Sequence, residues 1–567
     1  MKLEYKYRLI LLLGFIFIIG PIVLQANIDI EMSNKQTDSI IDSYGNRLFT
    51  TYYPGSDQVD GSGEFGIMLF HGMGNDQNSL DIYTTKFRGV HIFCTDFSGH
   101  GRSSGVIPSG NNSDLELADQ VLKAKAKFKE LSGLNDSQIF MLGHSLGARA
   151  IMKAVTIDSS LVRGCILLGA AIDVDNVSNS SWVNDLSPTY PDTNILIMSG
   201  ALEDVCPPEQ ALSLYLKLSN DTSLTETHDH EILETPLGIR KELRIFKALT
   251  HTHEASSFRC AEFAKRWVSE VLTSEDPLDP KFNYSRFEDY RVYYSIIELT
   301  GIILLLIYGQ KYIKFKQEES ITQISEVQED TNPMKLTNFR KYSLYKILIW
   351  FGGFGFAFII GLLIVVLPIG IPYFTLLFVC PITGYGIMSI ILYRVGKMPG
   401  FEGKWKPRVT NYFKTINWIN VIFAICCLVI ITTVLASLIN SFLYHVFPLN
   451  KRLIWLVVFT IFSTLGFYVL RLESEIIKEK YPDKVKYTIF NNLLFLFPFI
   501  IAVIVIFALG WIIYLPDAIH DVLIIGLVIL TGNLLQQIWK KSLFTAIAQA
   551  FLLFFLLLPR GQFALFF

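Results

Sequence analysis

The sequence has little cysteine and almost no net charge, and both shortages exclude classes of protein. Its 567 residues carry 49 Lys and Arg against 51 Asp and Glu, for a net charge of −2. A nucleic-acid-binding chain usually shows a basic excess, so no nucleic-acid partner is expected. The seven cysteines form no C-x-x-C pair, which argues against a zinc or redox site. Nor is there an internal repeat.

What the chain has in excess is apolar residues. They make up 51% of the sequence, and the mean hydropathy is +0.39. This is too apolar for a purely soluble protein and predicts several membrane spans. The first apolar run, Leu9 to Leu24, follows a basic start. Residues 1–26 are therefore expected to be a retained signal anchor or, since the run is short, a cleaved signal peptide.

Residues 27–290 have the composition of a soluble domain in which strands alternate with helices. Helical spacing covers Asp114 to Leu131. Such β-α alternation predicts an α/β fold with a mostly parallel sheet. Continuous apolar runs, typical of buried parallel strands, occur at Gly66–Phe70, Val90–Thr95, Ser137–Leu142, Cys165–Leu168, Asn194–Met198 and Leu243–Phe246.

The rest of the chain is predicted to be an all-α membrane domain. One span is expected at 291–309, a cytoplasmic linker at 310–346, and about seven helices in 347–567. Further apolar runs are Ile347–Leu367, Tyr373–Tyr393, Ile416–Ile439, Leu453–Leu470, Ile489–Ile513, Val522–Leu535 and Leu543–Leu558.

Two independent patterns indicate the same orientation. With nine spans and a cytoplasmic N-terminus, every strongly basic loop falls inside. N-x-[ST] sequons occur only in the soluble part, at Asn111, Asn135, Asn176, Asn179, Asn220 and Asn283. The soluble domain is therefore expected outside the cytoplasm. The spans hold few ionisable groups, chiefly Glu298 near the start of the second span. This favours an anchor or interaction domain over a transporter.

The stretch Gly143-His144-Ser145-Leu146-Gly147 organises the soluble domain. An apolar strand precedes it and a helical segment, Ala148–Val155, follows it. G-x-S-x-G between a strand and a helix is the pattern of a nucleophile elbow. The glycines are needed because side chains there would collide with the neighbouring strand or helix. Ser145 would then be the nucleophile, and the Leu146 amide would face the oxyanion.

Two other glycine-rich stretches follow predicted strands. His71-Gly72-Met73-Gly74 stands where a second oxyanion donor is needed, and the Met73 amide would pair with that of Leu146. In Asp96-Phe97-Ser98-Gly99-His100, the histidine is expected to be structural and to form hydrogen bonds within its own loop.

The acid and the base are expected in two later loops. After Asn194–Met198 comes Glu203-Asp204; Asp204 is favoured as the acid that orients an imidazole, with Glu203 a solvated neighbour. After the last strand come His251 and His253. If that segment is extended, both side chains point the same way. His251 is favoured as the base because it lies nearer the strand end, and His253 is the alternative.

Together, the H-G-x-G, D-x-x-G-H-G-x-S, G-H-S-L-G and G-x-x-x-D-x-x-x-P stretches resemble the α/β-hydrolase superfamily, in its dienelactone-hydrolase-like, monoacylglycerol-lipase-like and serine-aminopeptidase-like branches. The resemblance covers roughly residues 40–275. It implies a triad of Ser145, Asp204 and His251, without a cofactor or metal. The sequence departs from the family in a short Ala170–Asp192 segment, which leaves no room for a large lid. It also departs in an insertion at Asn220–Arg240.

The expected activity is that of a membrane-anchored serine hydrolase acting on a small-molecule or lipid ester at the bilayer. A peptidase or amidase is the close alternative, because the same triad cleaves amides. A non-catalytic ligand-binding domain coupled to the membrane part, and a transporter with an accessory hydrolase, are the alternatives of other classes. The insertion contains His228-Asp229-His230-Glu231, but four adjacent residues cannot all face one ion, so a metal is not expected.

Overall fold

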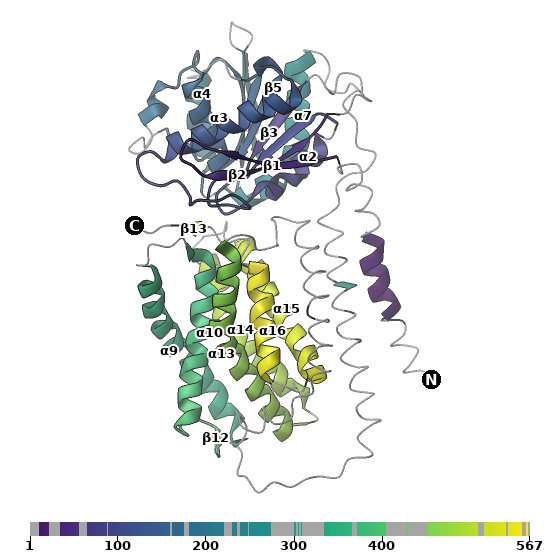
Figure 1. Cartoon of the computed structure of the whole chain (residues 1–567), viewed down its shortest axis with the longest axis vertical. Helices are drawn as coiled ribbons and strands as arrows, with labels where there is room; N and C mark the ends of the chain where they lie inside the picture. The colour runs from purple at the N-terminus through teal and green to yellow at the C-terminus, as the bar shows by residue number, and fades with distance from the viewer. Residues whose placement is uncertain are drawn as a thin grey trace.

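The computed structural model describes most of the soluble part and much of the helical part. The described residues are 9, 11–21, 34–55, 65–87, 89–158, 162–174, 181–203, 205–219, 230–234, 239–247, 249–273, 297, 300–301, 304, 308, 334–365, 371–403, 428, 451–482, 484–508, 515–539, 542–557 and 563–564. Figure 1 shows a sheet flanked by helices at the top and a bundle of helices below it.

One nine-stranded sheet forms the centre of the upper domain. Its order is β1-β2-β4-β3-β5-β6-β7-β9-β8. The six central strands pair in parallel, in the order β4-β3-β5-β6-β7-β9. Strands β1, β2 and β8 run antiparallel to their neighbours. Their bounds are β1 Gln36–Ile41, β2 Arg47–Tyr53, β3 Gly66–Phe70, β4 His91–Thr95, β5 Ile139–His144, β6 Gly164–Leu168, β7 Asn194–Gly200, β8 His230–Glu234 and β9 Arg240–Phe246.

The two faces of the sheet are covered by different helices. Successive strand residues point to opposite faces, so Met68 and Phe70 of β3 join one buried cluster and Ile67 and Leu69 join the other. The first cluster packs on α3 (Ser113–Ser132), α4 (Leu146–Ile157) and α5 (Pro208–Ser219). The second packs on α2 (Asp81–Lys86) and α7 (Phe258–Thr273). Helices on both faces of a mostly parallel sheet are the α/β arrangement that the sequence predicts.

All six predicted strands are present, with ends shifted by a few residues, and so are the helices expected at Asp114–Leu131 and Ala148–Val155. The antiparallel strands β1, β2 and β8 were not predicted from the sequence. Strand β8 lies in the expected insertion and adds an edge to β9. Residues 220–229 and 235–238 of that insertion, which include His228 and Asp229, lie outside the described residues.

The described part of the lower domain consists of long apolar helices. They are α9 (Phe339–Val365), α10 (Tyr373–Arg394), α13 (Lys451–Lys480), α14 (Val485–Ala508), α15 (Leu515–Trp539) and α16 (Ser542–Leu557). Among the described residues, two segments are long and apolar enough to cross a membrane, Leu453–Lys480 and Val485–Val505. Shorter apolar helices include Leu11–Pro21. The expected spans at 291–309 and Ile416–Ile439 lie almost entirely outside the described residues.

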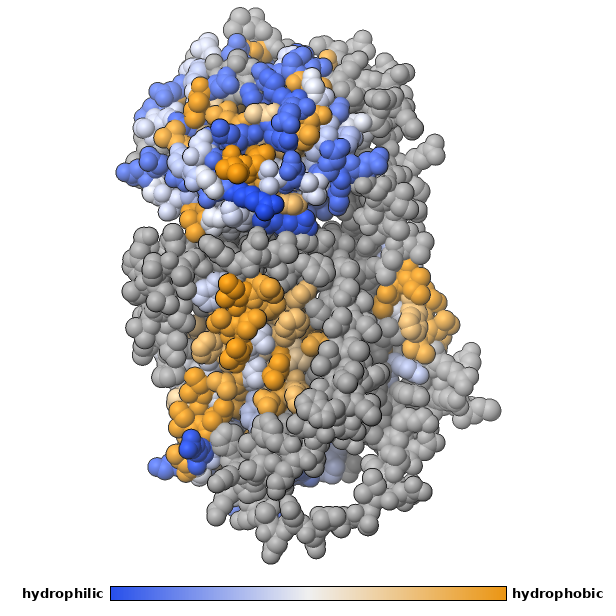
Figure 2. Space-filling view, in the orientation of Figure 1, coloured by the Kyte–Doolittle hydropathy of each residue, from blue (hydrophilic) through white to orange (hydrophobic). Residues whose placement is uncertain are grey.

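The helical domain buries charge and exposes apolar side chains. Lys346 of α9 and Glu473 of α13 form an ion pair of 2.8 Å, and neither side chain is exposed. Tyr385 and Tyr393 donate hydrogen bonds to the same carboxylate. Lys346 was expected in a polar linker; this was wrong, because α9 begins at Phe339 rather than at Ile347. Figure 2 shows orange, apolar patches over the coloured part of these helices, whereas the sheet domain is mainly blue and white with smaller orange patches.

Candidate active site

Ser145 lies at a sharp turn between β5 and α4. Its φ of 52° and ψ of −111° make it the one non-glycine residue with positive φ in the described part of the chain. Its amide donates to the carbonyl oxygen of Leu168 on the neighbouring strand β6, at 2.8 Å. A positive φ is costly for a residue with a Cβ, and such strain is maintained only where the surrounding structure enforces it. The geometry is that of the nucleophile elbow predicted from the sequence.

The glycines of the motif are required by close contacts. A Cβ on Gly143 would collide with the carbonyl carbon of Gly147, and one on Gly147 would collide with the backbone oxygen of Phe70. Real Cβ atoms do not approach backbone atoms this closely. The expected collisions with the neighbouring strand and helix are therefore confirmed.

The loop after β3 lies against the elbow. A Cβ on Gly72 would lie 2.6 Å from Nδ1 of His144 and 3.1 Å from Cβ of Ser145, so the loop that contains Met73 passes close to Ser145. Buried His71 fixes this loop. Its Nδ1 donates to the Gly72 carbonyl oxygen at 2.8 Å, and its Nε2 accepts from the Phe97 amide at 3.1 Å. Burial lowers the pKa of His71, in keeping with this neutral tautomer.

Leu146 is the first residue of α4, where a helix offers no internal acceptor for the backbone amide. Its amide and that of Met73 thus belong to the two backbone segments that flank Ser145. His100 was expected to be structural, and this is confirmed, because its Nδ1 pairs with the Ser98 carbonyl oxygen at 3.0 Å inside the same loop.

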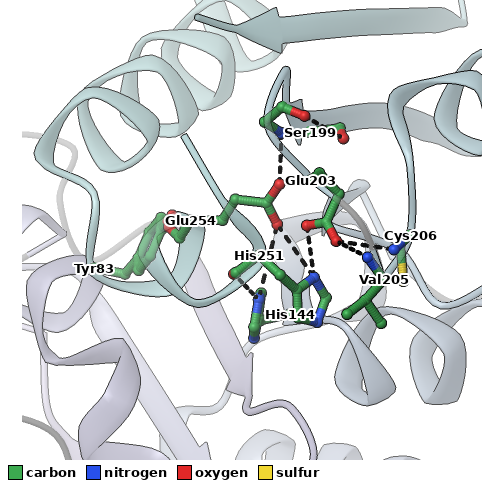
Figure 3. Close-up of polar contacts among 9 residues, drawn as sticks. Tyr83, His144, Ser199, Glu203, Val205, Cys206, His251 and Glu254 are labelled. Atoms are coloured by element: carbon green, nitrogen blue, oxygen red, sulfur yellow. Dashed lines mark hydrogen bonds and ion pairs between the residues drawn. The ribbon is translucent and has the colours of Figure 1, made fainter. Parts of the chain in front are cut away.

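His251 and Glu203 form a buried hydrogen bond beside the elbow (Figure 3). Nδ1 of His251 lies 2.7 Å from Oε2 of Glu203, and the two side chains are at most 9% exposed. The other carboxylate oxygen, Oε1, accepts from the amides of Val205 and Cys206, at 2.9 and 2.8 Å. These three donors fix the carboxylate in a single orientation and stabilise its negative charge.

The solvated role expected for Glu203 was wrong, because this side chain is buried and bonded to His251. Asp204, which the sequence favoured as the acid, lies outside the described residues. The two are consecutive, and sequence alone did not show which of them faces inward.

His251 is the first residue of the short helix α6 (His251–Ser256), which begins directly after β9 and a connecting loop. The segment is thus helical and not extended. The alternative base, His253, belongs to the same helix, and its side chain lies outside the described residues. A Cβ on Gly169 would lie 2.9 Å from Nδ1 of His251. Since Gly169 follows Leu168, which binds the Ser145 amide, the end of β6 lies between serine and histidine.

Two further buried groups surround His251, and the sequence analysis gave neither a defined role. Nε2 of His144 pairs with the backbone oxygen of His251 at 2.9 Å. Oε1 of Glu254 accepts from the Gly200 amide at 2.6 Å, while its Oε2 lies 3.9 Å from Nδ1 of His251. Burial and the nearby His251 ring hold the pKa of His144 well below its ordinary value. Burial and the neighbouring Glu203 hold the pKa of Glu254 well above its ordinary value.

The described 3-10 turn after β6 packs on α4. Trp182, in the 3-10 turn η5 (Ser181–Asp185), donates from Nε1 to Oδ2 of Asp114 at 2.8 Å. Asp114 also accepts two hydrogen bonds from Arg149, at 2.7 and 2.9 Å. Arg149 lies four residues after the nucleophile, so this network ties the segment to the helix that Ser145 begins.

Two groups have ligand atoms close enough to share an ion: His144, His251 and Glu254, and also Glu203, Cys206 and His251. His251 is common to both groups, and its Nδ1 is already bonded to Glu203. A metal would have to compete with the His251–Glu203 contact, so the donors present suit an acid–base pair better than a metal site.

These features decide the fold. The upper domain has the α/β-hydrolase fold. Residues 65–192 match the family model described as serine aminopeptidase, S33. The match covers β3 to the segment before β7, including the His71 loop and the elbow. A search of the curated proteins finds no match.

Solved structures similar to the chain include several hydrolases. An esterase from Thermogutta terrifontis is 12% identical, with a TM-score of 0.31, and the alignment covers 42% of this chain and 100% of that one. An esterase from Exiguobacterium antarcticum is 16% identical, with the same TM-score and coverages. A putative lipase from Acinetobacter baumannii AYE is 13% identical, with a TM-score of 0.31 and coverages of 44% and 97%. The strand order and the elbow, not these scores, carry the fold assignment.

Proposed function

We propose that this protein is a serine hydrolase that cleaves a carboxylic ester through an acyl-enzyme. The observation that carries the proposal is the buried hydrogen bond between His251 and Glu203, next to the strained Ser145. A nucleophile, a base and an acid that orients the base are what acyl transfer requires. We assign these roles to Ser145, His251 and Glu203, with Glu203 in the place for which the sequence favoured Asp204.

In the proposed mechanism, Oγ of Ser145 attacks the ester carbonyl while Nε2 of His251 takes the hydroxyl proton. Glu203 accepts from Nδ1 and stabilises the imidazolium that forms. The carbonyl oxygen becomes negative, and the amides of Met73 and Leu146 stabilise it. His251 then returns the proton to the leaving alcohol. Water attacks the acyl-enzyme by the same route in reverse, which releases the acid and restores Ser145.

An aminopeptidase is the second candidate, because the family model that matches residues 65–192 is described by that activity. The same three residues cleave amides. Esters are favoured for the chain because exposed apolar side chains border the site: Met73 is 55%, Leu202 is 54% and Val205 is 44% exposed. Leu202 and Val205 flank the turn of Glu203, and Met73 follows the elbow-facing Gly72. An apolar rim suits an acyl chain better than a charged α-amino group.

A fluorophosphonate probe and a substrate screen test the proposal. The full-length protein in detergent should label, and Ser145→Ala should abolish labelling and lower turnover by several orders of magnitude. Exposed Ser137→Ala is the matched control and should label fully. Acyl esters of increasing chain length should be hydrolysed faster than aminoacyl amides. Labelling of the Ser145→Ala protein would reject the nucleophile, and faster amide cleavage would favour the peptidase.

We further propose that the helical domain anchors the hydrolase in a bilayer, with the hydrolase outside the cytoplasm. On α13, Ile454, Val457 and Ile461 are 67%, 55% and 64% exposed, at the i, i+3, i+7 spacing of one helix face. Its polar Glu473 faces inward instead. A helix that exposes apolar side chains and buries its charged side chain against its neighbours suits a lipid environment. A cysteine introduced at Gln323, in the expected cytoplasmic linker, should resist an impermeant thiol reagent in intact cells, whereas ready labelling would contradict this orientation.

A further inference from the structure

Two carboxyl groups converge on one imidazole in the core of the hydrolase domain. Oε2 of Glu203 lies 2.7 Å from Nδ1 of His251, and Oε2 of Glu254 lies 3.9 Å from the same atom. The exposed fractions of the Glu203 and Glu254 residues are 5% and 0%. Two carboxylates cannot both stay ionised when they are so close in a dry site, because repulsion adds to the cost of desolvation.

The hydrogen bonds indicate which of the two carries the charge. Glu203 accepts from three donors: the Val205 amide, the Cys206 amide and the His251 imidazole. Glu254 accepts from one, the Gly200 amide, and among the described residues no donor serves its Oε2. Charge is favoured where donors gather and disfavoured where they are few. Glu203 is therefore the carboxylate and Glu254 the uncharged acid. The raised pKa of Glu254, caused first by burial and then by Glu203, agrees.

The surroundings of Glu254 decide where its proton points. The Glu203 carboxylate lies beside Glu254, because one oxygen of each group is within 3.9 Å of Nδ1 of His251. Nε2 of His144, 3.8 Å from Oε2 of Glu254, is occupied with the His251 carbonyl. A Cβ on Gly169 would collide with Oε2 of Glu254, so the space beside this oxygen is closed. The other titratable groups that face Glu254 are His251 on its own helix, Tyr83 on α2, Cys206 after β7 and Cys260 on α7.

We propose that Glu254 is a positioning residue that stays uncharged and donates its carboxyl proton in a hydrogen bond to Glu203. This inference rests on the proposed function. A carboxylate that accepts such a bond holds part of its charge in it and attracts the imidazolium less strongly. Glu254 therefore weakens the attraction between Glu203 and the protonated His251. Glu203 still holds His251 in place, but His251 releases its proton readily to the leaving alcohol.

The pH–rate profile of two variants tests this role. Glu254→Gln keeps a donor to Glu203 and an acceptor for Gly200, so the acid limb of the profile should stay within about 0.3 pH unit of the wild type. Glu254→Met keeps the size but donates nothing, so Glu203 should hold the imidazolium more tightly and the limb should move up by about half a unit or more. Glu242→Met, a buried carboxylate of β9 away from His251, is the control for lost stability and should leave the limb in place.

Other outcomes overturn the proposal. If Glu254 were ionised, both variants would remove a negative charge beside His251 and the limb would move down in both. If Glu254 only filled space, neither variant would move it. A second readout needs no turnover and therefore separates this idea from the catalytic proposal. Unfolded Glu254 ionises above about pH 4.5, so the wild type should lose stability relative to Glu254→Gln between about pH 5.5 and pH 8. A constant difference in unfolding midpoint would show an ionised Glu254.

Discussion

Nε2 of His144 donates a hydrogen bond to the backbone carbonyl oxygen of His251, across 2.9 Å. His144 immediately precedes the nucleophile, so this bond links the elbow directly to the start of α6. The imidazole rings of the two histidines lie 4.7 Å apart between centroids. His144 thus fixes the position of the first residue of α6, although the two residues are far apart in the sequence.

The burial of His144 makes the stability of the domain sensitive to acid. Native His144 stays neutral, because burial and the His251 ring hold its pKa well below 6.5, whereas the unfolded chain takes up a proton below that value. The free energy of unfolding should therefore fall as the pH drops below about 6.5, by up to about 1.4 kcal/mol per pH unit. His144→Gln keeps an Nε donor without a proton to take up. Denaturant unfolding at pH 7.5 and 5.5 should show a smaller loss in this variant, and an equal loss would contradict the assignment.

The choice of acid is tested by a pair of adjacent substitutions. Glu203→Gln removes the charge that stabilises the imidazolium while leaving the side chain in place. Turnover of an ester should fall by roughly 10³- to 10⁴-fold. Asp204→Asn should keep turnover close to that of the wild type. The opposite ranking in steady-state assays would return the role to Asp204.

The choice of base is tested in the same way. His251→Ala should remove nearly all turnover, because no other imidazole in the described part of the chain donates to Glu203. His253→Ala should reduce turnover only modestly. Circular dichroism should show that both proteins are folded. An inactive His253→Ala protein beside an active His251→Ala protein would place the base two residues later.

The buried ion pair of the helical domain predicts an asymmetry between single and double variants. Glu473→Gln leaves the Lys346 ammonium unpaired in a fully buried site and should cost about 3–5 kcal/mol. Adding Lys346→Met removes the orphaned charge and should restore much of that loss, while the amide oxygen introduced in place of the carboxylate still accepts from a tyrosine hydroxyl. Thermal unfolding of the full-length protein in detergent measures both.

The surface pair Lys127–Glu130 supplies the matched comparison. Its removal should leave the melting temperature nearly unchanged, because exposed ion pairs contribute little. A double variant no more stable than Glu473→Gln would mean that the charges are not what limits the stability of this bundle.

The central fold was predictable because a buried parallel strand has a distinctive composition. Gly66–Phe70 is buried at every position, and its continuous apolar run shows this without any structure. Strand β1 could not be found in the same way, since Gln36–Ile41 is largely exposed and polar. Such an edge strand is defined by its pairing with β2 and not by its own sequence.

The site was predictable down to its loops but not to every side chain. The glycines around Ser145 indicate a sharp turn already in the sequence, because a residue with a Cβ would collide with its neighbours there. Glu203 and Asp204 differ only in which way the turn points them, and that direction is set by the amides of Val205 and Cys206. Lys346 was misplaced for a related reason: its partner Glu473 lies 127 positions away, and a charge indicates a loop until that partner is known.

The backbone of Ser145 has one more consequence. Its φ of 52° suits glycine, and a side chain at that position holds the protein in a conformation of higher energy. Ser145→Gly would relax this turn, whereas Ser145→Ala would not. The inactive glycine protein should therefore outlast the active enzyme on heating. At position 145, thermal stability favours glycine and the proposed activity requires serine. The chain carries serine, the residue that gives the lower stability.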